Sequence, residues 1–363
     1  MEVKEKIRRV RQWLEEKELD ALLLTHMVNV RYLSGFTGTA AVLYITKDRA
    51  LLLTDFRYTE QARSQCPDWE VVELKNGLDE WLPEALQEDG CRRVGVEAAH
   101  VTVARWRLWK EKLRQRWGSG GPELVAAESP VEELRMIKSE EEIELIQRAC
   151  VLTDEAFQHI LSFLRPGVSE REIALELEFF MRKKGAEGRA FDFIVASGPR
   201  SALPHGVASE KKLAAGEAVV LDFGCIYGGY HSDLTRTVFL GPVSAEQQQI
   251  YDFVRQVQEK VRQEIKPGLT GAQADALARD AIAAAGWGDR FGHSLGHGVG
   301  LEIHEKPSLS VRSETVLRPG MVVTIEPGVY FPGKGGVRIE DTVVITSDGC
   351  RTLTTAPREM IIL

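Results

Sequence analysis

LAAGEAVVLDFG, residues 213–224, aligns without gaps on LRPGMVVTIEPG, residues 317–328. In each copy an apolar run typical of a buried strand leads to a carboxylate, Asp222 in the first copy and Glu326 in the second. Self-similarity of this kind is the signature of a duplicated structural unit. The alignment therefore predicts two related strands, each with a carboxylate at or near its end.

The similarity continues downstream of these two strands. GGYHSDLT, residues 228–235, matches GGVRIEDT, residues 335–342, and this match places Asp233 opposite Glu340. Each copy of the repeat therefore delivers two carboxylates at corresponding positions.

A helix start is duplicated as well. PGVS, residues 166–169, recurs as PGLT, residues 267–270, and in both copies a Glu or Gln follows three residues later, as in a helix capping box. Ser139 and Glu142 form the same pattern farther upstream, and predict another helix start. We expect residues 126–363 to form an α+β domain with an internal pseudo-twofold repeat.

The first part of the chain shows short β-rich runs that alternate with helical stretches. Apolar residues at helical spacing over residues 3–14 predict an opening helix. We expect strands at 21–24, 40–45, 51–54, 69–74 and 93–96, and helices near 58–66, 78–86 and 103–113. GSGGP, residues 118–122, is typical of a linker, although an ordinary surface loop is the alternative. We place a domain boundary near residue 125, so that residues 1–125 form an α/β domain.

The composition excludes several classes of protein. A chain of 363 residues suits two domains. Its formal net charge of -8 has the wrong sign for a protein that binds the phosphate backbone of nucleic acid. The five cysteines are odd in number and form no CxxC pair, which argues against a disulfide framework and against a cysteine zinc site. No apolar run has the length of a membrane span, and the opening MEVKEKIRRV lacks a signal-peptide core. We expect a cytoplasmic protein with neither a nucleic-acid nor a membrane partner.

The four carboxylates of the repeat predict a metal centre. Burying several carboxylates together is unfavourable unless cations neutralise them, because like charges and desolvation both raise their pKa values. Four carboxylates match the charge of two divalent ions, and an oxygen-rich site favours a metal such as Mn2+. Taken singly, Asp222 before Gly224 has the pattern of a turn, which is the alternative explanation. The shared register of all four residues across the repeat favours a dinuclear site.

Histidines gather in the same half of the chain. GHSLGHGVG, residues 292–300, contains His293 and His297 among glycines that let the backbone approach a metal or a substrate. His297 is the candidate nitrogen ligand. His205 and His304 lie nearby in sequence, and an ordinary polar role is the alternative for each of these histidines.

Residues 135–363 resemble the pita-bread metallopeptidases, the family of methionine aminopeptidase, aminopeptidase P and prolidase. The motifs that carry the resemblance to the Xaa-Pro branch are GHG at 296–298, IHEKP at 303–307 and VRIE at 337–340. YLSGFTG at 32–38 and TDFRY at 54–58 are similar to the creatinase/prolidase-type N-terminal domain. By resemblance, the metal ligands are Asp222, Asp233, His297, Glu326 and Glu340.

The resemblance also implies roles for these and neighbouring residues. Asp233 and Glu340 bridge two divalent ions, which are Mn2+ or alternatively Co2+ or Zn2+. Glu326 additionally accepts and donates a proton. His205, His293 and His304 line the substrate pocket and hydrogen-bond the reacting groups. Arg338 orients the substrate.

The implied activity is hydrolysis of the bond between an N-terminal residue and a following proline, in the manner of an Xaa-Pro aminopeptidase. An Xaa-Pro dipeptidase, or prolidase, is the alternative. A catalytically inert pita-bread binding protein and another enzyme of the same fold, such as a creatinase or a methionine aminopeptidase, are further alternatives. The resemblance implies a proline-containing peptide as substrate and a homodimer as the assembly.

Overall fold

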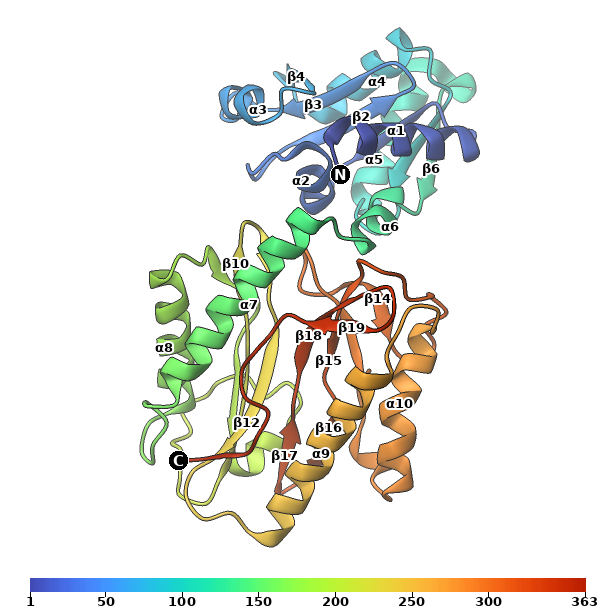
Figure 1. The fold of residues 1–363 in the computed structure, drawn as a ribbon. Coiled ribbons are helices and arrows are strands. Elements are labelled where there is room, and N and C mark those ends of the chain that lie inside the picture. Colours follow the sequence, from blue (N-terminus) through green and yellow to red (C-terminus); the bar gives the residue numbers. More distant parts are fainter. The chain divides into compact units, whose positions relative to one another are not determined.

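The computed structural model describes residues 1–363 and divides the chain into two compact units, Met1–Arg135 and Met136–Leu363 (Figure 1). No helix in either unit combines the length and the apolar character that crossing a bilayer requires.

The first unit is built on a six-stranded sheet with the order β4-β3-β2-β1-β5-β6. Its strands are β1 (Ala21–Leu24), β2 (Val42–Thr46), β3 (Ala50–Thr54), β4 (Glu70–Glu73), β5 (Arg93–Glu97) and β6 (Glu123–Ala127). The helices are α1 (Val3–Glu16), α2 (Met27–Ser34), α3 (Thr59–Gln65), α4 (Leu78–Glu88), α5 (Val103–Trp117), the 3-10 turn η1 (Gly118–Gly120) and α6 (Pro130–Met136). β1 pairs antiparallel with β2 and parallel with β5, so the sheet is mixed. All strands and helices predicted up to residue 113 are present close to their expected bounds, and α2 is an addition.

The end of the first unit differs from the sequence prediction. GSGGP at 118–122 is not followed by a new domain but by β6, which pairs in parallel with β5 along its whole length. The unit ends at Arg135, ten residues beyond the predicted boundary near 125. The reason is that β6 completes the edge of the sheet and buries Leu124 in the core of the first unit.

The second unit has four long helices and several small sheets. The helices are α7 (Glu140–Ile160), α8 (Glu170–Lys183), α9 (Ala245–Glu264) and α10 (Gly271–Ala284), with 3-10 turns η2 (Gly198–Ala202) and η3 (Gly288–Arg290). One sheet has the order β20-β12-β9-β8, from β8 (Ile194–Ser197), β9 (Ala218–Phe223), β12 (Leu234–Phe239) and β20 (Ile361–Ile362). Another has the order β14-β13-β15-β18-β19, from β13 (Gly296–Gly298), β14 (Glu305–Leu309), β15 (Val322–Ile325), β18 (Asp341–Ile345) and β19 (Cys350–Thr352). The smaller sheets contain β7 (Gly188–Arg189), β10 (Cys225–Tyr227) and β11 (Tyr230–His231), and β16 (Gly328–Phe331) with β17 (Gly335–Arg338).

The internal repeat is visible in both the helices and the strands of the second unit. α8 and α10 each begin with a complete capping box, and α7 begins with the one predicted at Ser139 and Glu142. β9 pairs antiparallel with β12, and in the second copy β15 pairs antiparallel with β18. Before each helix, a glycine N–H donates to a leucine carbonyl at 2.9 Å, Gly167 to Leu213 and Gly268 to Leu317.

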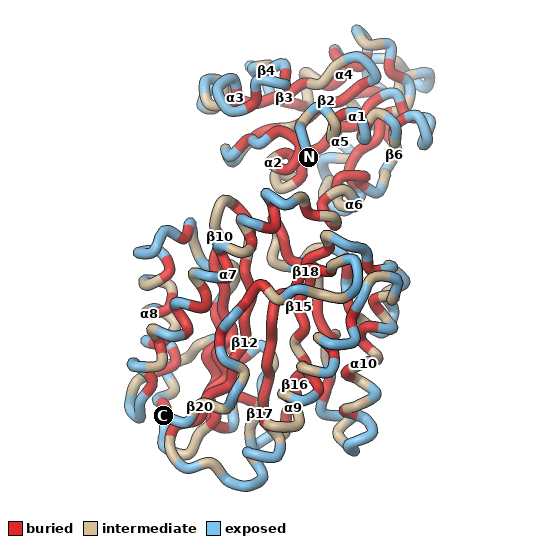
Figure 2. The backbone as a smooth tube through the Cα atoms, viewed as in Figure 1, coloured by how far each residue is buried: buried red, intermediate tan, exposed pale blue.

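Each copy of the repeat has its own core. Buried side chains of α7 and α8 pack against β9 and β12, and those of α9 and α10 pack against β15 and β18. Figure 2 shows the buried strands between helices whose outer surfaces are exposed. Alternate residues of each strand therefore face helices, which leaves the residues between them to face the opposite side of the sheet.

Candidate metal centre

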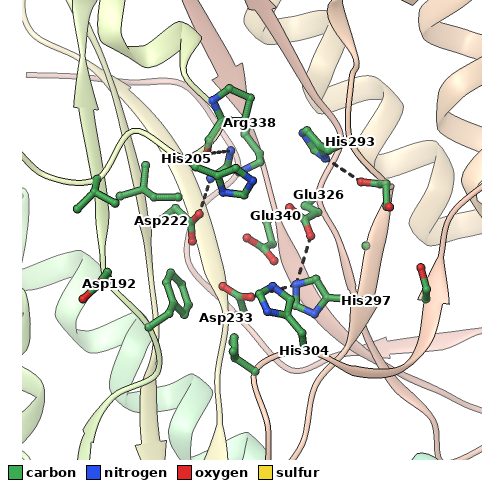
Figure 3. A pocket seen from close by; sticks show the side chains of 18 residues that line it. Asp192, His205, Asp222, Asp233, His293, His297, His304, Glu326, Arg338 and Glu340 are labelled. Atoms are coloured by element: carbon green, nitrogen blue, oxygen red, sulfur yellow. Dashed lines mark hydrogen bonds and ion pairs between the residues drawn. The ribbon is translucent and has the colours of Figure 1, made fainter. Parts of the chain in front are cut away.

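All the site residues predicted from the sequence meet in one place. A cavity of about 410 Å³ in the second unit is lined by Asp222, Asp233, His297, Glu326, Glu340, His205, His293, His304 and Arg338 (Figure 3). The structure therefore brings together residues from both copies of the repeat and from the loops between them.

Strand alternation explains how the carboxylates reach the cavity. On β9, Leu221 and Phe223 belong to the core beneath α7 and α8, and Asp222 between them lines the cavity. In the second copy, Ile325 of β15 faces the core, and Glu326 follows it into the cavity. Asp233 and Glu340 come directly before β12 and β18, and both line the same cavity.

A tight group of three side chains forms the centre of the site. Candidate ligand atoms of Asp233, His297 and Glu340 lie within 4.8 Å of one another. His297 Nε2 is 3.5 Å from Asp233 Oδ2 and 3.4 Å from Glu326 Oε1. On the other side of the ring, His297 Nδ1 lies 3.2 Å from the carbonyl oxygen of Gly298. An imidazole that donates one N–H to a backbone carbonyl presents its second nitrogen as a metal ligand.

Three carboxylate oxygens in the cavity lack hydrogen-bond donors. Asp222 Oδ1, Asp233 Oδ1 and Glu340 Oε1 are buried and accept no hydrogen bond. Buried polar atoms are nearly always satisfied, so each of these oxygens needs a partner of another kind. Oxygen and imidazole donors around one cavity fit divalent cations, which would satisfy all three.

The pKa values of the acidic residues and of His297 also show that the cavity lacks positive charge. Burial raises the pKa of Asp222 to about 7, although the Arg338 guanidinium opposes this shift. Burial and the neighbouring carboxylates also raise the pKa of Glu340, and burial raises that of Asp233. Burial alone would lower the pKa of His297, but the carboxylates of Asp233 and Glu326 raise it to about 9. Cations in the cavity would keep the carboxylates ionised and the imidazole neutral.

Two threonine hydroxyls orient the carboxylates and were not identified from the sequence. Thr235 Oγ1 donates to Glu340 Oε2 at 2.6 Å, and Thr324 Oγ1 donates to Glu326 Oε1 at 3.1 Å. The repeat position that matches Thr235 is Thr342, which donates to the backbone carbonyl of Asp233 at 2.9 Å. The two copies therefore support each other's carboxylate segments across the pseudo-twofold axis.

Tyr330 is the second feature that the sequence did not reveal. Arg338 donates to Asp222, and its Nη1 lies 2.9 Å from the Tyr330 hydroxyl. That hydroxyl lies 2.9 Å from His293 Nε2, and His293 Nδ1 lies 2.8 Å from the carbonyl of Ser294. The carbonyl can only accept, so Nδ1 carries the proton and Tyr330 donates to Nε2. Burial lowers the pKa of His293, in agreement with a neutral ring. In the sequence, Tyr330 looks like an ordinary core aromatic residue, because it lies in the apolar strand GVYF.

The rest of the lining is mainly apolar. It includes Phe191, Ile194, Pro204, Val207 and Ile303. Asp192 also lines the cavity, but its side chain is 66% exposed and pairs with Arg189 at 2.7 Å. The histidines left out of the predicted site, His26, His100, His159 and His231, do not line the cavity.

Comparison with known proteins identifies the family. The model of Metallopeptidase family M24 matches residues 144–347, and the model of the Creatinase/Prolidase N-terminal domain matches residues 6–137. The chain belongs to metallopeptidase family M24. It is therefore a metal-dependent peptide hydrolase rather than an inert binding protein, and the predicted pita-bread fold with a creatinase-type N-terminal domain is confirmed.

Solved structures resemble this M24 peptidase along its whole length. A Xaa-Pro dipeptidase from Bacillus anthracis is 49% identical with a TM-score of 0.96, and the match covers 100% of both chains. A prolidase from Pyrococcus horikoshii is 40% identical with a TM-score of 0.92, and covers 98% of this chain and 100% of its own. An X-Pro aminopeptidase from Thermotoga maritima is 39% identical with a TM-score of 0.89, and covers 99% of this chain and 100% of its own.

Replacing either central carboxylate should empty the metal centre. We expect Asp233→Ala or Glu340→Ala to lose both ions, because the bridging position that each is predicted to occupy serves two metals at once. Elemental analysis of the purified variants measures this loss. Asp192→Ala is the matched control, since this acid lines the same cavity but is exposed, and it should retain the metal content of the parent protein. Two ions per chain in either central variant would refute the bridging assignment.

The stability of the metal-free protein should fall as pH rises. Asp222 and His297 have folded-state pKa values of about 7 and about 9, above their ordinary values of 3.8 and 6.5. The stabilisation from the extra bound protons is full below the ordinary values and is lost as pH rises through the folded-state values. We expect the Tm of chelator-treated protein to decrease between about pH 5 and about pH 9, more steeply than that of metal-loaded protein. Equal slopes in calorimetry would contradict this expectation.

Proposed function

We propose that the protein is a dinuclear Xaa-Pro dipeptidase that uses Mn2+, with Co2+ or Zn2+ as alternative ions. The observation that carries the proposal is the convergence of Asp233, His297, Glu340 and the other predicted ligands in a single cavity. Relatives named Xaa-Pro dipeptidase or prolidase match the whole chain at 40% to 49% identity, which supports the dipeptidase over the aminopeptidase favoured in the sequence analysis.

Two ions would be held by the five predicted ligands, which are Asp222, Asp233, His297, Glu326 and Glu340. Divalent ions held by these residues would supply a water activated as a nucleophile at neutral pH and a positive charge to polarise the scissile carbonyl. Glu326, oriented by Thr324, accepts the proton of the water and passes it to the leaving nitrogen of proline.

The histidines complete the reaction site. Burial, together with the nearby His297, lowers the pKa of His304, so its neutral ring can donate one hydrogen bond. His205 and His304 line the same cavity, and in this mechanism they donate to the carbonyl oxygen as negative charge develops on it. His293 contacts Tyr330 with one nitrogen and lines the same cavity.

Arg338 is held too firmly to serve as a mobile carboxylate binder. Its guanidinium donates to Asp222, Tyr330, Thr235 and the carbonyl of Pro204. It is also the sole Lys or Arg among the residues that line the cavity. A dipeptidase must bind the terminal carboxylate of the substrate proline, which requires strong hydrogen-bond donors such as an uncommitted Lys or Arg. A cavity that lacks such a cation can accept a peptide that continues beyond the proline. This observation favours Xaa-Pro aminopeptidase as the second candidate function, as does the Thermotoga maritima relative.

The assembly and location form part of the same proposal. The family resemblance supports a homodimer, and cysteines that are free and mostly buried support a cytoplasmic location.

Substitution should separate the ligands from the residues that contact substrate. We expect His205→Ala, His293→Ala and His304→Ala to keep their metal while kcat falls by on the order of 10². His297→Ala should instead lower the metal content itself. Elemental analysis and steady-state kinetics measure the two effects, with His159→Ala on α7 as a control outside the cavity. Metal loss in His293→Ala equal to that in His297→Ala would show that the division is wrong.

Substrate length distinguishes the two candidate functions. With Mn2+ supplied, we expect kcat/KM for Ala-Pro to exceed that for Ala-Pro-Ala by on the order of tenfold. Quantifying released alanine by chromatography tests this directly. Equal release of alanine from both peptides would replace the dipeptidase with the aminopeptidase. Failure to cleave any Xaa-Pro bond would remove both candidates.

A further inference from the structure

Two buried acids, each paired with a partly exposed arginine, brace the loops that carry histidines of the cavity. One pair lies on α10 and holds the loop of His293. The other involves α8 and holds the loop of His205. The two helices are equivalent in the internal repeat, but their bracing residues are not.

The brace on α10 consists of Asp275 and Arg279. The Asp275 side chain is fully buried, and Arg279 Nε and Nη2 donate to its carboxylate at 2.6 and 2.9 Å. Arg279 also donates to the carbonyl of Phe291 at 3.1 Å and to that of His293 at 2.8 Å. Asp275 Oδ1 accepts the N–H of Leu295 at 3.0 Å. One ion pair therefore holds three alternate residues of the loop by their backbones.

Ring contacts extend this brace to the imidazole. The Arg279 guanidinium lies 4.5 Å from the centre of the Phe291 ring. The Phe291 and His293 rings meet edge to face, with their centres 5.0 Å apart. The position of the His293 ring therefore depends on Arg279 through both the backbone and the neighbouring aromatic ring.

The brace at α8 consists of Glu170 and Arg200. Glu170 is fully buried and accepts hydrogen bonds from the N–H and hydroxyl groups of Ser197 and Ser209, which flank the His205 loop. Arg200 donates to Glu170 and, at 2.9 Å, to the carbonyl of Val207. Glu170 and Arg200 therefore hold the backbone both before and after His205.

The duplication itself does not account for these braces. The capping residues Ser169 and Thr270 correspond in the repeat, so Glu170 corresponds to Gly271, where a Cβ would lie 2.2 Å from the Ser308 carbonyl oxygen. Asp275 in turn corresponds to Ala174. The two copies therefore brace their loops with residues that do not correspond in the repeat.

We propose that Asp275 and Arg279 are positioning residues that set the His293 imidazole against the substrate, and that Glu170 and Arg200 do the same for His205. The inference rests on the proposed function, because it assumes that both histidines act on the substrate. A displacement of about 1 Å at a reacting group can cost on the order of 10² in rate, so a loose loop lowers turnover even when the ligands are intact.

Arg279→Lys tests the proposal with little risk to folding. Lysine retains the positive charge beside Asp275 but lacks the planar fork that reaches several acceptors. A crossed double-mutant cycle combines Arg279→Lys or Arg200→Lys with His293→Ala or His205→Ala in the full-length, metal-loaded enzyme. If an arginine acts through one histidine, its substitution lowers kcat much less once that histidine has been removed. If the two act independently, their effects on the activation free energy add.

We expect Arg279→Lys to lower kcat about tenfold in the parent enzyme and in His205→Ala, but less than twofold in His293→Ala. Arg200→Lys should lower kcat about tenfold in the parent enzyme and in His293→Ala, but less than twofold in His205→Ala. Metal content should stay at the parent value throughout. An equal loss of kcat in all backgrounds would overturn the proposal, because it would mean that Arg279 supports the fold in general.

Amide hydrogen exchange gives a readout that does not depend on activity. Arg279→Lys should accelerate exchange in residues 291–295 and leave residues 204–207 unchanged. Unchanged exchange in the His293 loop would also overturn the proposal. The cycle can use any peptide that the parent enzyme cleaves, so failure on Xaa-Pro substrates affects the proposed function and not this inference. A parent-level kcat in Arg279→Lys would overturn the proposal as well.

Discussion

Concentrated negative charge in a buried space is the constraint on which the second unit depends. Asp222, Asp233, Glu326 and Glu340 line one cavity, and Arg338 is the only permanent cation among its lining residues. Burial of like charges is tolerable only with compensation, so neighbouring groups are specialised to provide it. Threonine hydroxyls satisfy some carboxylate oxygens, and divalent ions fit those that remain. The metal requirement of the M24 family follows from this electrostatic demand as much as from the chemistry of hydrolysis.

Much of this site could be predicted from the sequence because two carboxylate positions occur in both copies of the internal repeat. Asp222 matches Glu326 and Asp233 matches Glu340 in two aligned segments, each without gaps, so the repeat indicates all four carboxylates together. Strand alternation then places Asp222 on the face opposite the core. The first five strands of the first unit were equally clear, because each is a short β-rich run, most of them largely apolar and buried.

Other features gave no distinct signal. The glycine-rich stretch at 118–122 has the composition of a linker, yet it turns the chain into β6, and only the pairing with β5 shows this. Tyr330 and Thr235 are ordinary residues for buried strands, and their roles arise from contacts distant in sequence. Asp275 and Arg279 have the spacing of an exposed helical ion pair, although Asp275 is buried. Long-range geometry, not residue type, gives these positions their importance.

The crossed threonine contacts have a consequence for how such a fold could originate. Thr235 of the first copy supports Glu340 of the second, and Thr342 of the second supports the Asp233 segment of the first. A single copy would hold half of the carboxylates and would have to associate with another molecule to complete the set. Fusion into one chain makes that encounter intramolecular, at an effective concentration in the millimolar range or above. Once the halves no longer meet by chance, each is free to diverge, and in this chain the second copy alone contributes a histidine, His297, to the group with Asp233 and Glu340.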